Sequence, residues 1–336
     1  MLEIYGKKMD FRDLGRDLGF INSAASHNSL ISRRALENGI QEIEACPICK
    51  DANKTQIKEI NGLLWNKCDY CGHFFVSNVP LDVSSIYDTG NEAQKQAYID
   101  EELFNKRKKL IAKPKAEFID SVITESASAD KGLWIDIGCG VGELLYEASA
   151  LGYDTVGFEA DPSEVTFAKN HGLNVIQTYI GSNQDSSASE YLSNAKIVTA
   201  FNILEHIADP LSWMKNIVSQ MCKGGHLVIE TPREPSLTGF CNLIGLPYKH
   251  MVTAGHLHIF TEKSMEIIQS ECSLETIAKW CFGNGFVDLI NTALILSDIE
   301  INNSILNDIF EKGDGIQKSI DEAGLSEVLF TIYKVR

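Results

Sequence analysis

The sequence predicts an α/β protein with a small cysteine-containing module ahead of a larger sheet domain. From residue 133 onwards, short apolar runs alternate with segments of helical spacing, which is typical of parallel strands joined by helices. Before them, residues 46–71 contain two C-x-x-C pairs. A chain of 336 residues, 44% of them hydrophobic, is long enough to build both parts.

Four segments are expected. They are a polar lead segment (1–45), a metal-binding module (46–79), a linker with helices (80–125) and the sheet domain (126–336). In the linker, Pro114 should kink or split a helix over 101–123. The Ser-rich residues 180–194 are expected to form a surface loop. Within the sheet domain, strands are expected at 133–137, 154–159, 174–179, 196–201, 226–230, 274–282 and 327–335, and helices at 143–151, 163–171, 210–221, 262–270 and within 286–323.

Composition excludes several classes of protein. The net charge of −16 disfavours a polyanionic partner such as RNA or DNA, because the protein's own field would repel it. The sequence has no run of about 18 apolar residues, so no membrane span is expected. The N-terminus lacks the apolar segment of a secretory signal. The chain has nine cysteines, an odd number, and four of them form a paired cluster. This pattern suits a reducing compartment better than a disulfide framework, so a cytoplasmic protein is expected.

A glycine-rich turn follows the first strand of the sheet domain. Residues 134–145 read Trp-Ile-Asp-Ile-Gly-Cys-Gly-Val-Gly-Glu-Leu-Leu, so that Asp136 precedes Gly138, Gly140 and Gly142. Glycines at a strand-to-helix turn let the backbone approach a ligand closely. The next strand ends at Glu159, where a carboxylate accepts hydrogen bonds from the ribose hydroxyls of an adenosine.

The details of this turn favour S-adenosylmethionine (SAM) over a dinucleotide. Its spacing is G-x-G-x-G, whereas dinucleotide sites use G-x-G-x-x-G. Asp136 would also repel a pyrophosphate, whereas it would attract the ammonium and sulfonium groups of SAM.

Four motifs together resemble the class I SAM-dependent methyltransferases. The resemblance implies a Rossmann-like sheet of seven strands, parallel except for the last, with SAM across the ends of its first two strands. It places Asp136, Gly138 and Gly140 at the methionine part, Glu159 at the ribose, Ala160 and Asp161 near the adenine, and Phe201 and Asn202 under the cofactor. The motifs are Asp136–Gly142, Gly157–Pro162, Ala200–Pro210 and Lys223–Pro232.

The cysteine pairs predict a structural zinc ribbon. Cys46 and Cys49 form one knuckle and Cys68 and Cys71 the other, with Gly72 following to let the chain turn sharply. Two such pairs supply four thiolates, which complete a tetrahedral Zn²⁺ shell and leave no open position for catalysis.

The segment from Cys68 to Pro80 resembles a narrower group of methyltransferases, which carry an N-terminal zinc-binding module and modify sugars and glycans. Trp280–Asn284 resembles a segment of the same group. Some members methylate carbon in nucleotide-linked deoxysugars, but those have a further C-terminal domain and a tyrosine where this chain has Ile203. The sequence therefore favours transfer to oxygen.

Histidines are the candidates for chemistry on the acceptor. His206, which follows the fourth strand, is the first candidate for a general base or substrate contact, with Glu205 orienting it. A structural role for this pair, capping and packing the next turn, remains an alternative. His256 is the second catalytic candidate, and Tyr87 and His258 are candidate substrate contacts.

The predicted function is SAM-dependent methyl transfer to a hydroxyl of a sugar, nucleotide sugar or related small metabolite. Three alternatives stay open: C- or N-methylation of a deoxy- or amino sugar, methylation of RNA, and a catalytically silent SAM-fold binding protein. The charge disfavours RNA, and the intact acid and glycine residues disfavour the silent protein.

Overall fold

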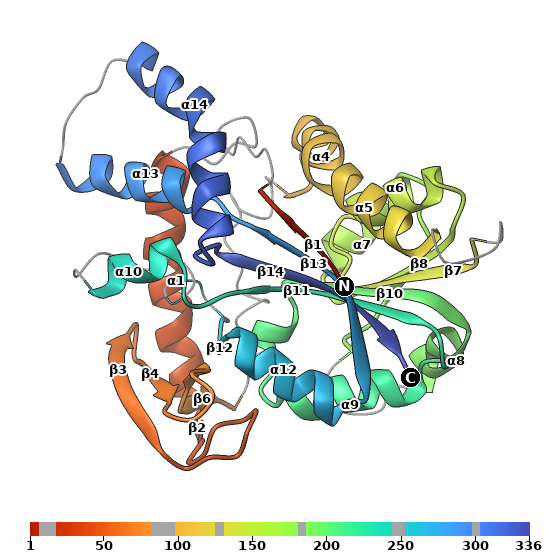
Figure 1. The fold of residues 1–336 in the computed structure, drawn as a ribbon, viewed down its shortest axis with the longest axis horizontal. Helices are drawn as coiled ribbons and strands as arrows, with labels where there is room; N and C mark the ends of the chain where they lie inside the picture. Colours follow the sequence, from red (N-terminus) through yellow and green to blue (C-terminus); the bar gives the residue numbers. More distant parts are fainter. Residues whose placement is uncertain are drawn as a thin grey trace.

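An eight-stranded, mostly parallel sheet forms the centre of the molecule (Figure 1). The computed structural model describes residues 1–6, 18–81, 98–124, 131–180, 186–243, 251, 253, 255–297 and 303–336. Only β14 runs antiparallel to its neighbours, as a Rossmann-like methyltransferase sheet requires. The order is β1 (Leu2–Tyr5), β13 (Leu274–Phe282), β14 (Val328–Val335), β11 (His226–Pro232), β10 (Ala195–Phe201), β7 (Leu133–Ile137), β8 (Asp154–Glu159) and β9 (Val175–Gln177).

The eighth strand corrects the sequence-based expectation of seven. β1 was expected to belong to a polar lead segment, yet it pairs in parallel with β13 at the sheet edge. The Trp280 indole donates to the Gly6 carbonyl (2.9 Å), and the Gly6 amide donates to the Cys281 carbonyl (3.0 Å). Four residues carry too little periodicity to predict such a strand, because its partner lies about 275 residues away.

Helices cover both faces of this sheet (Figure 1). The apolar sides of α5 and α6 pack on one face, with Trp134 and Phe330, and α8, α9 and α12 pack on the other. Their bounds are α4 (Glu101–Arg107), α5 (Lys113–Thr124), α6 (Glu143–Ala150), α7 (Pro162–Asn170), α8 (Ser186–Asn194), α9 (Pro210–Gln220) and α12 (Glu262–Glu271).

The α-helix of the linker is interrupted just before Pro114, where a π-helical turn (Lys108–Ala112) separates α4 from α5. The proline lies in the first turn of α5, where a missing N–H is tolerated. The expected loop at 180–194 contains α8, because Ala188 and Leu192, four residues apart, are buried against the sheet. Packing outweighs the poor helix propensity of its serines.

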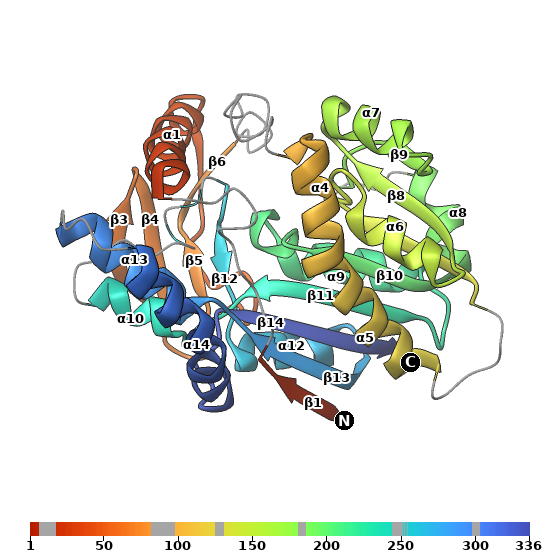
Figure 2. The same ribbon diagram turned by 90° about the horizontal axis from the view of Figure 1, so that it is seen from above.

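The cysteine module forms a second sheet in the order β12 (His258–Ile259), β5 (Phe74–Val76), β4 (Leu63–Cys68) and β3 (Lys54–Ile60). Its edge strand β12 comes from the sheet domain and pairs antiparallel with β5. Figure 2 shows this sheet beside the larger one, with further elements around it. These are α1 (Leu18–Glu37), β2 (Ile40–Glu42), β6 (Asn78–Pro80), α10 (Leu237–Leu243), α13 (Gly285–Ser297) and α14 (Asn303–Glu322).

A buried pair of histidines joins the two parts. The His258 Nε2–H donates to the Ile207 carbonyl (2.9 Å), and its Nδ1 lies 3.2 Å from Nε2 of His73. Burial lowers the pKa of His73 well below its usual range and that of His258 to about 4, so both rings are neutral. His73 is fully buried.

Candidate functional site: a glycine turn at the carboxyl ends of the strands

The three glycines of the turn all adopt left-handed backbone conformations. Gly138 has φ +69°, and a Cβ there would lie 2.1 Å from the Cδ1 atom of Ile203, which follows β10. A Cβ on Gly142 would lie 2.4 Å from the Cδ1 atom of Leu173. Glycine is therefore required by conformation and by space, and the turn brings the ends of β7 and β10 together.

Glu159 closes the turn through its carboxylate. One oxygen accepts from the Gly140 amide (2.9 Å), and the other accepts from the amides of Ala160 (2.6 Å) and Asp161 (2.9 Å). These three bonds fix the carboxylate at the end of β8, next to the glycine turn, as the resemblance implies for a ribose acceptor.

Asp136 lies at the end of β7 and is 5% exposed. Its carboxylate accepts from the Thr199 hydroxyl (2.6 Å), and burial raises its pKa to about 7. A cationic ligand nearby would favour the ionised form of this acid.

Glu164 is an acid of this region that motif reasoning missed. Its Oε2 lies 3.4 Å from the position of a Cβ on Gly140. Burial, followed by the charges of Glu159, Asp161 and Glu143, raises its pKa to about 8. A site surrounded by these acids suits the sulfonium and ammonium groups of SAM and disfavours phosphates.

Asp161 has a structural role whatever its distance from an adenine. Its carboxylate accepts from the amides of Ser163 (2.7 Å) and Glu164 (3.3 Å) and so caps the N-terminus of α7. Pro162 at the first position of the helix completes this start signal. The turn after Glu159 is thereby fixed, with Ala160 between the two acids.

Phe201 and Asn202 end β10 beside a buried ion pair. Asn202 has φ +54° and its amide donates to the Glu230 carbonyl (3.0 Å). The Glu230 carboxylate pairs with Lys115 (2.5 Å), whose ammonium lies 5.0 Å from the centre of the Phe201 ring. Lys115 and Glu230 lie about 115 residues apart in sequence, so no local motif could indicate their pairing.

The predicted catalytic residues converge after β10. Glu205, His206 and His256 each place one ligand atom within 4.8 Å of the others. The His206 Nδ1 lies 2.9 Å from the Gly255 carbonyl, so the Gly255 carbonyl orients this ring, and the Glu205 carboxylate does not. The His206 and His256 rings meet edge to face, with centroids 4.7 Å apart.

Of the two predicted substrate contacts, His258 lies among the described residues. Both ring nitrogens of His258 are used within the protein, which favours a structural role for this residue. Tyr87 lies outside the described residues.

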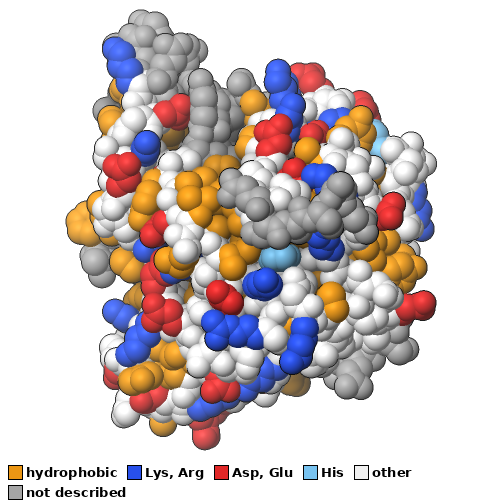
Figure 3. All heavy atoms as spheres, turned by 45° about the vertical axis from the view of Figure 1, so that its right-hand side comes forward, with side chains coloured by type: hydrophobic (Ala, Val, Ile, Leu, Met, Phe, Trp, Pro, Cys, Tyr) orange, Lys and Arg blue, Asp and Glu red, His pale blue; other side chains and the backbone are white. Residues whose placement is uncertain are grey.

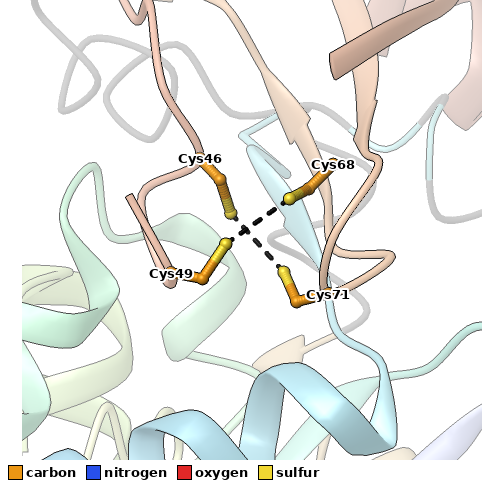
Figure 4. A group of neighbouring side chains, drawn as sticks. All are labelled: Cys46, Cys49, Cys68 and Cys71. Carbon is orange, nitrogen blue, oxygen red and sulfur yellow. Dashed lines mark hydrogen bonds between the residues drawn. The ribbon is translucent and has the colours of Figure 1, made fainter. Parts of the chain in front are cut away.

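The four predicted metal-ligating cysteines point toward a common centre (Figure 4). The sulfur atoms lie 3.6 Å apart in the Cys46–Cys71 pair and 3.4 Å apart in the Cys49–Cys68 pair, which is too far for a disulfide. In each knuckle a backbone amide donates a hydrogen bond to the carbonyl of the first cysteine. The Lys50 amide donates to the Cys46 carbonyl, and the Gly72 amide donates to the Cys68 carbonyl. Lys50 and Gly72 both have positive φ, so the two turns share one geometry.

The fold and site define a Rossmann-like α/β protein built for a SAM-like cofactor. Residues 96–279 match the methyltransferase domain family, and the chain belongs to that family. The family match supports SAM-dependent methyl transfer as the type of chemistry.

The curated relatives include ubiquinone biosynthesis O-methyltransferases. That of Proteus mirabilis (strain HI4320) is 28% identical over 116 residues, which are 34% of this chain and 47% of the relative. That of Aliivibrio fischeri (strain MJ11) is 31% identical over 99 residues, which are 29% of this chain and 42% of the relative. The chain thus spans less than half the length of either relative.

Solved structures give a weaker likeness. A SAM-dependent methyltransferase from Archaeoglobus fulgidus aligns with 70% of this chain and 100% of its own, at TM-score 0.44 and 16% identity. Among the described residues, no helix is long and apolar enough to cross a membrane.

Proposed function

We propose that this protein transfers the methyl group of SAM to a hydroxyl group of a sugar, nucleotide sugar or related small metabolite. The observation that carries the proposal is the fixed Glu159 carboxylate beside three left-handed glycines at the ends of β7 and β8. A ribose binds there, and the acids around it favour a cationic donor.

The acceptor side is supported by the cluster of Glu205, His206 and His256. Glu205 and His206 lie shortly after β10, and Ile203, two residues before Glu205, packs over Gly138 of the cofactor turn. Methyl transfer is an in-line displacement, so the acceptor oxygen has to be held near the methyl and must lose its proton. Histidines next to the expected cofactor site suit both tasks.

The choice of oxygen as acceptor atom has two supports. Ile203 stands where the resembling C-methyltransferases have a tyrosine, and the matching curated relatives are named O-methyltransferases. The proposal that the acceptor is a sugar rests only on the resemblance of the cysteine segment to sugar-modifying methyltransferases. The names of the relatives favour a second candidate, a hydroxyl of a ubiquinone precursor.

We further propose that the four cysteines hold a structural Zn²⁺ ion. Their paired separations of 3.4 and 3.6 Å approach the ~3.8 Å edge of a tetrahedron with Zn–S bonds of ~2.3 Å. Three of the four side chains are buried, and a cation compensates the cost of burying thiolates. Such an ion would fix the two knuckles, and it takes no part in the reaction.

RNA remains a disfavoured acceptor. The net charge is −16, and acidic and basic side chains are interspersed on the face shown in Figure 3. Binding of RNA that is strong and weakens with salt would contradict this view.

The test is incubation with methyl-labelled SAM and a panel of nucleotide sugars, glycan precursors, phenolic quinone precursors and RNA. We expect mass spectrometry to find one O-linked methyl on a small molecule. His206→Ala and His256→Ala should lose turnover and retain SAM binding in calorimetry. Normal turnover by both variants would contradict the assigned acceptor side, and labelled RNA would contradict the acceptor class.

A further inference from the structure

The Glu205 carboxylate is an unusual group to find in a protein interior. Its residue is 1% exposed, and neither carboxylate oxygen has a hydrogen-bond partner among the described residues. A buried carboxylate without donors is costly unless a proton or a cation compensates it.

Two imidazoles lie beside this carboxylate, where they would contact the same cation. One atom each from Glu205, His206 and His256 lies within 4.8 Å of the other two. Three atoms so placed lie within about 2.8 Å of a common point, so small side-chain movements bring them to the ~2.0–2.2 Å of metal–ligand bonds.

The His206 ring is already set as a ligand. Its Nδ1 lies 2.9 Å from the Gly255 carbonyl, which requires the proton on Nδ1 and leaves the lone pair on Nε2. A backbone carbonyl that fixes the tautomer is the usual outer support of a metal-bound histidine.

The backbone also holds the cluster together. The Leu257 amide donates to the Glu205 carbonyl (2.8 Å), which ties the 3₁₀ turn of Leu204–His206 to the segment that carries His256. Two elements about 50 residues apart in sequence thus present their side chains to one point.

We propose that Glu205, His206 and His256 form a binding site for a divalent transition-metal ion, which binds the acceptor hydroxyl. Two imidazoles and one carboxylate suit Zn²⁺, Fe²⁺, Co²⁺ or Mn²⁺ and leave coordination positions for an oxygen ligand. This inference rests on the proposed function and replaces the role of His206 as a general base, since Nε2 cannot bind a metal and accept a proton.

The reaction balances without any redox change. The bound hydroxyl loses its proton to water because the ion lowers its pKa. An oxygen electron pair then forms the new O–C bond, the S–C electron pair returns to sulfur as a neutral thioether, and the ion stays divalent.

The test begins with the full chain treated with EDTA, after which the zinc that remains is counted by mass spectrometry. Co²⁺ is then added and followed by calorimetry and absorption. Besides any Co²⁺ that replaces zinc lost from the four cysteines, we expect one Co²⁺ per chain to bind without a thiolate-to-metal charge-transfer band, since this site has no sulfur ligand. Glu205→Gln, His206→Ala and His256→Ala should each weaken that binding about tenfold or more and leave SAM binding intact.

His171→Ala is the matched control, because His171 and Glu101 form an exposed carboxylate–histidine pair 3.0 Å apart. It should bind Co²⁺ as the unaltered protein does. The inference is overturned if the unaltered protein binds no such ion, if the cluster variants bind it equally well, or if only His171→Ala loses it. Should no acceptor be methylated, the proposed function fails, while the Co²⁺ titration still decides this inference.

Discussion

Gly138 shows how strictly single residues are constrained in this site. It combines φ +69° with a Cβ position only 2.1 Å from Ile203. Gly138→Ala should therefore shift the turn and raise the Kd for SAM about tenfold or more, which corresponds to ~1.4 kcal/mol. Calorimetric titration with SAM measures the change.

Gly172 provides the control for backbone strain. It has φ +76°, but nothing lies within 4 Å of its Cβ position. Gly172→Ala should lower the free energy of unfolding by roughly 1–2 kcal/mol and leave SAM affinity unchanged. Equal losses of SAM affinity in both variants would show that strain, and not contact with Ile203, governs the turn.

Glu159 should carry much of the cofactor affinity. Glu159→Gln keeps the size of the side chain and removes the charge that the amides of Gly140 and Asp161 now hold in place. Hydrogen bonds to charged groups contribute ~1.5–3 kcal/mol, so the Kd for SAM should rise about 10- to 100-fold. An unchanged Kd would mean that the ribose binds elsewhere.

Glu164 should make stability depend on pH. Its folded pKa of about 8 lies above the unfolded value of ~4.3, so its stabilising contribution is complete below ~4.3 and is lost as the pH rises through 8. The glutamine of Glu164→Gln cannot ionise. The denaturation midpoint of this variant should therefore be higher than that of the unaltered protein at pH 9 and equal to it near pH 4. A gap that is constant with pH would contradict the raised pKa.

Sequence reasoning reached the residues of the cofactor turn because their constraints are local. Asp136, Gly138 and Glu159 each stand at a strand end that the alternation of apolar runs predicts. It could not reach the Lys115–Glu230 ion pair or the burial of His73, because both depend on partners more than 100 residues away.

At the level of elements, periodicity located the strands that have apolar runs and missed those that depend on a partner. The strand at 133–137 was predicted with its observed bounds, whereas β1 and β12 are short and form only against an existing sheet edge. The Ser-rich composition hid α8, whose apolar side consists of few residues.

The packing of α8 can be tested at Leu192, which is 1% exposed. Leu192→Ala should lower the free energy of unfolding by about 2–5 kcal/mol, because it removes buried methyl groups and leaves a cavity. Chemical denaturation measures this, and Ser193→Ala on the same helix, at an exposed position, should change it little. Equal small effects would place residue 192 in a loop, as the composition suggested.

On the scale of the whole molecule, the cysteine module and the sheet domain share one core. Cys46, Cys68 and Cys71 belong to the same buried cluster as Phe260 of the sheet domain. The Thr261 hydroxyl that caps α12 also donates to the Cys71 carbonyl (2.8 Å). The two parts should therefore unfold together.

Cys46→Ser tests this coupling. Loss of one thiolate should release the Zn²⁺ ion that we propose for this site and lower the free energy of unfolding by at least about 2 kcal/mol, in a single transition. Calorimetry and metal analysis measure both, and Cys222→Ser, at an exposed cysteine outside the cluster, should change neither. Two separate transitions would contradict the shared core.

The central claim, a SAM site at the ends of β7, β8 and β10, is tested most directly by a crystal structure of the full chain grown with S-adenosylhomocysteine. The account predicts this ligand with its ribose hydroxyls on Glu159 and its sulfur beside the turn that holds Gly138. Crystals that show the ligand elsewhere, or a dinucleotide bound in this turn, would contradict it.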